Sequence, residues 1–132
     1  MPKFSQESFS KLSTCHPDLQ VLFYEVIKYC DCEVLEGYRS QEDQEAAFQA
    51  GNTMHRYPYG KHNGQPSTSV DVAPIPLDSQ KVNHLYWFIG YVFGTAQKLK
   101  DEGKITHGIR SGANWLNDYQ HTKDLIHFEL IE

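Results

Sequence analysis

The amino-acid sequence predicts an α+β fold in which helices pack on a small, mostly antiparallel sheet. Two long stretches, 17–30 and 79–102, repeat apolar residues at spacings of three and four, as helices with one buried face do. Two shorter stretches, 68–73 and the residues from about 126, have the pattern of half-buried strands. The expected order is helix, helix, strand, helix, strand, long helix, strand, strand, which favours the α+β class.

The length and charge of the chain fit one domain over residues 1–132. Hydrophobic residues make up 39% and charged residues 22% of the chain, which is enough for a core without disulfides. The net charge of -5 argues against a general nucleic-acid binder and gives no attraction to an anionic membrane. No apolar run approaches the length of a membrane span, and the first residues lack the apolar core of a signal peptide. We therefore expect a protein made in a cytoplasm, without membrane insertion. A monomer is the expected state, although these observations do not determine it.

The chain has three cysteines, an odd number, and two of them are Cys30 and Cys32. Their Cys-x-Cys spacing is too short for a comfortable disulfide and differs from the Cys-x-x-Cys of redox and zinc motifs. We expect packed, reduced thiols, in keeping with a reducing compartment.

The first part of the chain predicts two helices. Ser5 or Ser8 can cap a short helix that ends near Ser13, and Pro17 can take the first position of the next helix. The apolar face of this second helix reads as core and comprises Leu19, Leu22, Phe23, Val26, Ile27 and Cys30.

A short strand over 33–39 and a helix over 41–50 are expected to follow. Ser40 and Asp43 approximate a capping box at the start of this helix, and Gly51 ends it. Residues 52–66 show no periodicity and predict a loop, and a loop of this length in a small domain often lines a site.

The second half predicts the strand 68–73, the long helix 79–102 and two further strands. On the first of these strands, Ser69, Asp71 and Ala73 share one face. A strand near Ile109, a loop through Lys123 and the final strand complete the chain.

Three residues are candidate metal ligands: His62, Asp71 and His127. Asp71 lies between two valines, where an ionised carboxylate is costly to bury without a cation or several hydrogen bonds. His127 shares a strand face with Glu129, so its imidazole could bind a metal or form a salt bridge. Catalytic zinc is commonly held by three nitrogen or oxygen side chains, which leaves a fourth position for water.

Four groups of residues resemble the zinc peptidases of the D-alanyl-D-alanine carboxypeptidase and dipeptidase superfamily (peptidase M15 type). Within it, the chain is similar to the L-alanyl-D-glutamate endopeptidases that serve as bacteriophage endolysins. The groups are Gly-Tyr-Arg-Ser at 37–40, Lys-His-Asn at 61–63 with Asp-Val-Ala-Pro at 71–74, Gly-Ala-Asn-Trp at 112–115, and Asp-x-x-His-Phe-Glu-Leu at 124–130.

The resemblance implies a role for each matching residue. His62, Asp71 and His127 become the zinc ligands, and Asp124 the general base. Arg39 becomes the cation that faces the developing oxyanion, and Trp115 lines the substrate groove. We expect Asp124 on a loop before the final strand, and His121 and Glu129 are the rival bases.

The sequence departs from the family pattern at two places. His62 and Asp71 are nine positions apart, two more than is usual, which residues 63–67 can accommodate as a wider turn. Asn114 stands where an aspartate often precedes the tryptophan.

The expected function is a Zn2+-dependent hydrolase that cuts stem peptides of bacterial peptidoglycan, most specifically at L-Ala–D-Glu. As an endolysin it would accumulate in the host bacterial cytoplasm and reach the wall after a separate holin-type protein permeabilises the membrane, giving host lysis and antimicrobial action. One catalytic domain is expected, with no separate cell-wall-binding domain. The alternatives are a D-Ala-D-Ala carboxypeptidase or dipeptidase of the same superfamily, and a non-catalytic, metal-stabilised wall-binding module.

Overall fold

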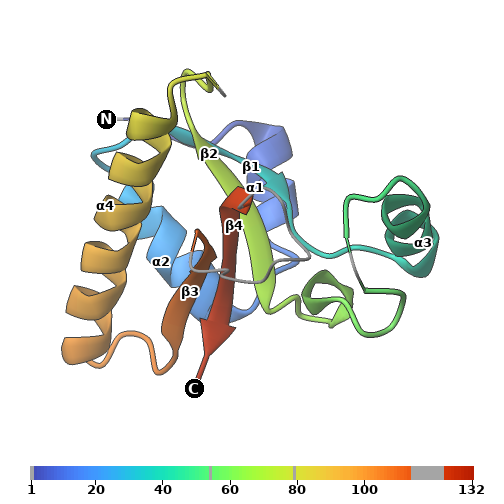
Figure 1. Ribbon diagram of the computed structural model, residues 1–132. Coiled ribbons are helices and arrows are strands. Elements are labelled where there is room, and N and C mark those ends of the chain that lie inside the picture. Colours follow the sequence, from blue (N-terminus) through green and yellow to red (C-terminus); the bar gives the residue numbers. More distant parts are fainter. Residues whose placement is uncertain (1, 54, 79, 114–123) are drawn as a thin grey trace.

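The computed structural model describes residues 2–53, 55–78, 80–113 and 124–132, and its elements follow the predicted order (Figure 1). Four α-helices, four strands and one 3-10 turn are formed by these residues. They are α1 (Gln6–Leu12), α2 (Pro17–Ile27), β1 (Cys32–Glu36), α3 (Gln41–Gln49), η1 (Lys61–Asn63), β2 (Ser69–Pro74), α4 (Val82–Asp101), β3 (Gly108–Gly112) and β4 (Asp124–Ile131).

The four strands form one sheet in the order β1-β2-β4-β3, and every neighbouring pair is antiparallel. The predicted α+β class is therefore confirmed. The two central strands, β2 and β4, are the two whose alternating pattern carries candidate ligands. A central position fixes the register of both strands, because each is hydrogen-bonded on two sides.

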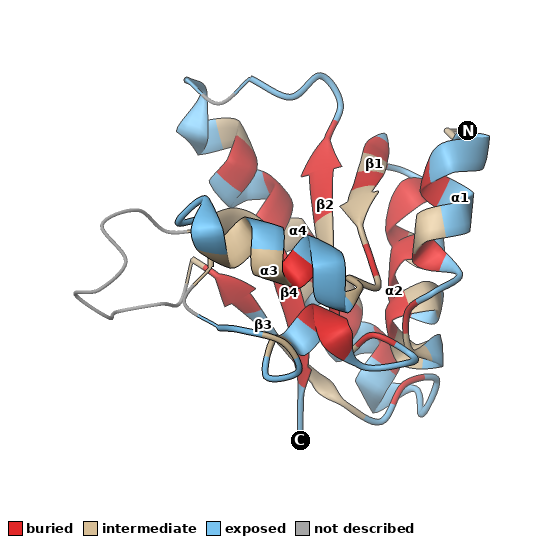
Figure 2. Ribbon diagram, turned by 90° about the vertical axis from the view of Figure 1, so that its right-hand side faces the viewer, coloured by how far each residue is buried: buried red, intermediate tan, exposed pale blue. Residues whose placement is uncertain are grey.

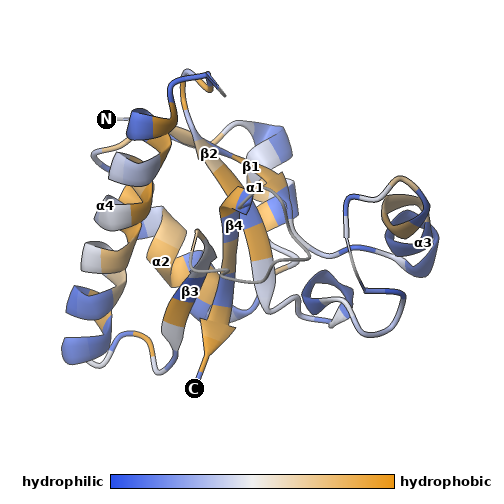
Figure 3. Ribbon diagram, viewed as in Figure 1, coloured by the Kyte–Doolittle hydropathy of each residue, from blue (hydrophilic) through white to orange (hydrophobic). Residues whose placement is uncertain are grey.

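Helices cover one face of this sheet, and the opposite face carries the site. Both α2 and α4 pack against the first face, while α3 and η1 lie on the other side of the strands (Figure 1). The turned view shows α3 in front of the sheet and buried residues along the strands behind it (Figure 2). The apolar side of α4 is turned toward the sheet, as its helical spacing predicts (Figure 3).

The core lies between the sheet and the helices α2 and α4. Phe128 of β4 is fully buried at its centre, with its ring 5.5 Å from that of Phe23 and 6.2 Å from that of Phe88. Both contacts are edge-on, the arrangement that aromatic quadrupoles favour. The apolar face predicted for the second helix is part of this core, including Leu19, Leu22 and Val26.

Local capping signals in the sequence are confirmed at three helices. The Ser5 hydroxyl accepts a hydrogen bond from the Ser8 amide at the start of α1, and Pro17 is the first residue of α2. At α3, the Ser40 hydroxyl accepts from the Asp43 amide. Gly51, just after α3, has a φ of 79°, a left-handed conformation that glycine adopts without strain.

Several predicted boundaries were wrong by a few residues. The strand predicted over 33–39 spans Cys32–Glu36, and its pairing with β2 shifts register between Val34 and Glu36. The loop predicted over 52–66 contains the turn η1, and α4 begins at Val82. Most of the loop predicted through Lys123 falls outside the described residues.

The three cysteines are buried and reduced, as predicted. Among the described helices, none is both long enough and apolar enough to cross a bilayer.

Candidate metal centre

Asp71 and His127 face each other across the two central strands. The register of β2 and β4 sets Asp71 opposite His127 and Val70 opposite Phe128. Since successive side chains on a strand point to opposite faces, the alternation that buries Val70 and Phe128 turns the other pair away from the core. Asp71 Oδ1 lies 3.2 Å from His127 Nδ1.

His62 reaches the same carboxylate from η1. Its Nε2 lies 3.4 Å from Asp71 Oδ1, and its ring is 5.3 Å from that of His127. The turn is held in place by its backbone, because the Arg39 amide donates to the His62 carbonyl at 2.7 Å. The structure therefore brings together the three residues predicted as ligands, and all three offer a ligand atom within 4.8 Å of the others.

The outer partners of the two imidazoles assign their ring protons. His62 Nδ1 lies 2.8 Å from the Gly37 carbonyl oxygen, which can only accept, so this nitrogen carries the proton. His127 Nε2 lies 2.9 Å from Glu129 Oε1 and donates to that carboxylate. His62 Nε2 and His127 Nδ1 both face Asp71. Each of these nitrogens can donate to the carboxylate when it is protonated, and each offers a lone pair to a metal ion when the imidazole is neutral.

This geometry fits a tetrahedral zinc ion. Two imidazole nitrogens and one carboxylate oxygen form a donor set that zinc takes in catalytic sites. Ligands at about 2.0–2.1 Å in a tetrahedron lie about 3.3 Å from one another. Asp71 Oδ1 is 3.4 Å from one candidate nitrogen and 3.2 Å from the other. The residues present therefore match the group in type and in spacing.

The buried ionisable groups of the site stabilise one another's charged forms. Burial opposes the ionisation of Asp71, but hydrogen bonds from His127 and His62 hold the pKa of its carboxyl well below its usual range. Burial likewise opposes the charged form of His127, yet its hydrogen bonds to Asp71 and Glu129 raise its pKa to about 9. For Glu129, burial is outweighed by His127, and its pKa is lowered. A cation among these groups is electrostatically favoured.

Asp124, the predicted general base, lies near the triad but on a strand. It is the first residue of β4 and pairs with Gly112 beyond a register shift, so the expected loop placement was wrong. Burial, together with the nearby Asp71 carboxylate, raises the pKa of Asp124, whereas the imidazoles of His127 and His62 lower it. The Asp124 carboxyl group therefore interacts electrostatically with all three members of the triad.

Arg39 lies in the same region, where its guanidinium is held by neighbours. Its Nε and Nη2 each donate to a different Glu36 oxygen at 2.8 Å, and its Nη1 donates to Gln44 Oε1 at 3.0 Å. These contacts fix the plane of the guanidinium. The hydrogen bonds and ion pair with Glu36 raise the pKa of Arg39 against the opposing effect of burial, and the nearby carboxylates of Asp71 and Asp124 raise it further.

Sequence reasoning missed the residues that support η1. Gln44 is fully buried, and its Oε1 also accepts from Asn63 Nδ2 at 3.2 Å. The same Asn63 group donates to the Arg39 carbonyl at 2.9 Å, while Asn63 Oδ1 accepts from the Gly60 amide. The sequence offers one signal for the burial of Gln44: it lies on the side of α3 that otherwise carries small or apolar residues. Trp115, Asn114 and His121 lie outside the described residues.

A second group of potential ligands, His16, Asp18 and His107, does not share this geometry. His16 Nδ1 accepts a hydrogen bond from the Asp18 amide, and Asp18 Oδ2 lies 2.7 Å from His107 Nδ1. The same oxygen accepts from the amides of Thr106 and His107. Oδ2 of the Asp18 carboxylate is thus already engaged by these groups. These hydrogen bonds connect α2 to the residues that precede β3.

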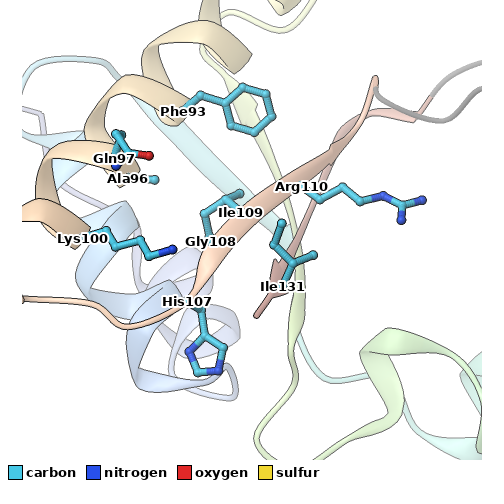
Figure 4. Close-up of a pocket in the computed structure, with 9 residues that line it drawn as sticks. All are labelled: Phe93, Ala96, Gln97, Lys100, His107, Gly108, Ile109, Arg110 and Ile131. Atoms are coloured by element: carbon cyan, nitrogen blue, oxygen red, sulfur yellow. The ribbon is translucent and has the colours of Figure 1, made fainter.

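A hollow of about 380 Å³ between α4 and β3 is also separate from the triad (Figure 4). His107 lies at one end of it, and Phe93, Ile109 and Ile131 supply apolar lining. None of the three candidate ligands lines this hollow.

An antiparallel sheet that presents two oriented imidazoles, a shared carboxylate and a second, partly buried carboxylate has the features of a hydrolase centre. Comparison with known families is in agreement: the chain belongs to the phage L-alanyl-D-glutamate peptidase family, which matches residues 1–131. The protein is therefore an enzyme, a peptidase of the L-alanyl-D-glutamate type, as the sequence resemblance predicted.

A solved structure shares the fold. The Serratia marcescens L-Ala D-Glu endopeptidase ChiX is 22% identical to this chain, with a TM-score of 0.75, and the match covers 98% of this chain and 90% of that one. Comparison with curated proteins finds no match.

Proposed function

We propose that this peptidase is zinc-dependent and hydrolyses the L-Ala–D-Glu bond of peptidoglycan stem peptides as a phage endolysin. The observation that carries the proposal is the convergence of His62 Nε2 and His127 Nδ1 on Asp71 Oδ1 at tetrahedral spacing. The family supplies the substrate, because its name specifies the two residues between which the bond is cut.

In this proposal His62, Asp71 and His127 hold the zinc. Two neutral imidazoles and one carboxylate leave the ion with a net positive charge. When bound, zinc supplies Lewis acidity at the scissile carbonyl and makes water a stronger acid.

Asp124 serves as the general base. Its carboxylate takes a proton from the attacking water and then delivers that proton to the leaving amine of D-Glu. Burial and the Asp71 carboxylate raise its pKa toward the working range of such a base. Glu129 is a poorer candidate, because Oε1 of its carboxylate already accepts from His127.

Arg39 stabilises the negative charge that develops on the carbonyl oxygen. A guanidinium has five N–H donors, and Glu36 and Gln44 engage three of them, at Nε, Nη2 and Nη1. One further N–H on each terminal nitrogen can donate to the substrate. Donors fixed in advance are worth most here, because they need no reorganisation during the reaction.

The proposed biological setting follows from the endolysin role. The enzyme accumulates in the host cytoplasm and meets peptidoglycan after a separate holin-type protein permeabilises the membrane. The family resemblance assigns Trp115, which lies outside the described residues, to binding of the stem peptide.

Digestion of purified peptidoglycan, analysed by mass spectrometry, tests the substrate. We expect stem peptides that begin with D-Glu and glycan strands that retain L-Ala. Loss of terminal D-Ala alone would instead indicate a carboxypeptidase, and no cleavage of walls from several bacteria would contradict the proposed substrate.

The Asp124→Asn variant tests the mechanism. It should keep about one zinc at the centre and keep the fold, while turnover falls by about 10²–10⁴-fold, the usual contribution of an acid–base group. A substitution of Asp124 that leaves hydrolysis near the wild-type rate would show that another group is the base.

A further inference from the structure

Glu129 has contacts that the proposed chemistry does not use. Its side chain is almost fully buried on the face of β4 that carries His127, and its Oε1 lies 2.9 Å from His127 Nε2. This nitrogen is the one turned away from Asp71. Glu129 therefore contacts Nε2 of the His127 imidazole, while Nδ1 of the same ring faces Asp71 in the candidate metal centre.

Neighbouring elements fix the position of the Glu129 carboxylate. It lies in the middle of β4, opposite Ser69 of β2 on one side and opposite Arg110 of β3 on the other. Its second oxygen, Oε2, is 3.9 Å from the ammonium of Lys61, the residue that precedes His62 on η1. The carboxylate is thus built into the sheet and also lies beside the segment that supplies another candidate ligand.

The contact determines which ring nitrogen of His127 can bind a metal. A neutral imidazole carries one proton, and a carboxylate acceptor at Nε2 keeps the proton there. Nδ1 is then left with its lone pair toward Asp71. Without this acceptor, the ring could place its proton on Nδ1 or rotate about its side-chain bonds, and either change would remove a ligand.

We infer that Glu129 is a positioning residue that fixes the orientation and tautomer of His127 through its hydrogen bond at Nε2. The inference rests on the zinc site of the proposed function and assigns no proton transfer to Glu129. In many metal sites, a histidine ligand donates its second ring N–H to a carboxylate, and this carboxylate contributes to metal affinity. Glu129 has the same place beside His127. The backbone carbonyl of Gly37 has the equivalent place behind His62.

Two conservative variants separate the hydrogen bond from the charge. Glu129→Gln keeps the length of the side chain and an oxygen that can accept from Nε2, but it loses the charge. Glu129→Asp keeps the charge but shortens the side chain by one methylene, so its oxygens no longer reach Nε2. Positioning by the hydrogen bond predicts that Glu129→Gln binds zinc more tightly than Glu129→Asp.

The measurement is zinc affinity by competition with a chromogenic chelator, at fixed pH. We expect the affinity of Glu129→Asp to fall by about 10–100-fold, as for other outer-partner substitutions, and that of Glu129→Gln to fall less. Glu33→Ala, a change of another carboxylate on the same sheet, is the matched control and should leave zinc affinity unchanged.

A spectroscopic readout tests the same inference independently of hydrolysis. In zinc-loaded protein labelled with nitrogen-15 histidine, the Nε2 proton of His127 should exchange slowly in the wild type and in Glu129→Gln, and rapidly in Glu129→Asp. Equal or tighter zinc binding by Glu129→Asp than by Glu129→Gln, or slow exchange in both variants, would overturn the inference. Failure of the wild type to bind zinc at His127 would instead count against the proposed function.

Discussion

At the scale of single residues, three side chains of the proposed site are each held by a second group. His62 is held by a backbone carbonyl, His127 by Glu129, and Arg39 by Glu36 and Gln44. Such contacts restrict side chains that would otherwise lose rotamer entropy when substrate binds. The proposed ligands His62, Asp71 and His127 were predicted from the sequence through the family resemblance, and the structure brings the three together.

The supporting residues could not be predicted in the same way. The place of Gln44 on the side of α3 that carries small and apolar residues hints at burial, but nothing in the sequence indicates that its amide joins Arg39 to Asn63. The contact arises only when α3 folds against η1, which lies beyond a long loop. Polar side chains of this kind have no periodic signal, since their partners are set by tertiary packing.

Replacement of Gln44 by alanine should destabilise the protein by about 1–3 kcal/mol, because it leaves buried hydrogen-bonding groups without partners. Gln44 Nε2 donates to the His55 carbonyl at 2.5 Å, and its Oε1 accepts from Arg39 and Asn63. Urea unfolding followed by circular dichroism measures the change. Gln49→Ala, at an exposed position of the same helix, is the control and should change the free energy of unfolding by less than about 0.5 kcal/mol. Equal stability of the two variants would show that the Gln44 contacts contribute nothing.

At the scale of elements, the order of helices and strands was predicted in full, whereas several boundaries were not. Helical and strand periodicities are local, so α2, α4 and β2 could be found from spacing alone. The start of β4 at Asp124 depends on pairing with β3, twelve positions earlier in the chain, and such pairing is invisible to a local pattern. The face that His127 shares with Glu129 was predicted correctly, because alternation along one strand is local.

The irregular pairing of β3 with β4 places Asp124, and it requires a glycine. A Cβ added at Gly112 would overlap the carbonyl oxygen of Asp124. We therefore expect Gly112→Ala to displace the start of β4 and to lower turnover, while zinc binding by the triad is largely kept. Steady-state hydrolysis and metal analysis of the purified variant measure the two effects separately.

Gly90→Ala is the matched glycine control for this prediction. Gly90 is an exposed residue of α4, and an added Cβ there meets nothing within 4 Å. This substitution should stabilise the protein by about 0.5–1 kcal/mol through helix propensity, with turnover unchanged. If Gly112→Ala were as active as the control, the close approach to Asp124 would have no role in placing the proposed base.

At the scale of the whole molecule, one sheet separates two environments. Its helix-covered face holds the aromatic core around Phe128, and its opposite face holds the triad of His62, Asp71 and His127, although the two sets alternate along the same strands. A shift of β4 by one residue would exchange them, so the core itself enforces the geometry of the site. The sequence predicted this division, while the position of α3 and η1 over the polar face required the structure.

The reactivity of the buried cysteines measures whether this core is folded. Burial raises the pKa of Cys15 to about 11, against a smaller opposing effect of its hydrogen bond with Thr14, and burial raises the pKa of Cys32 to about 12. The thiolate is the reactive form of cysteine. In the native protein at pH 8, Cys15 should therefore react with iodoacetamide on the order of a hundredfold, and Cys32 on the order of a thousandfold, more slowly than in the unfolded chain, where thiol pKa values are about 8.5.

Because both thiols are inaccessible in the native fold, their labelling should depend on unfolding. Phe128→Ala removes a large side chain from the core and should cost about 3–5 kcal/mol. In this variant the labelling of Cys15 and Cys32 should accelerate in parallel, as measured by mass spectrometry of peptides after timed alkylation. Fast labelling of either thiol in the wild type, while circular dichroism still shows the native fold, would mean that its part of the core opens locally rather than with the molecule as a whole.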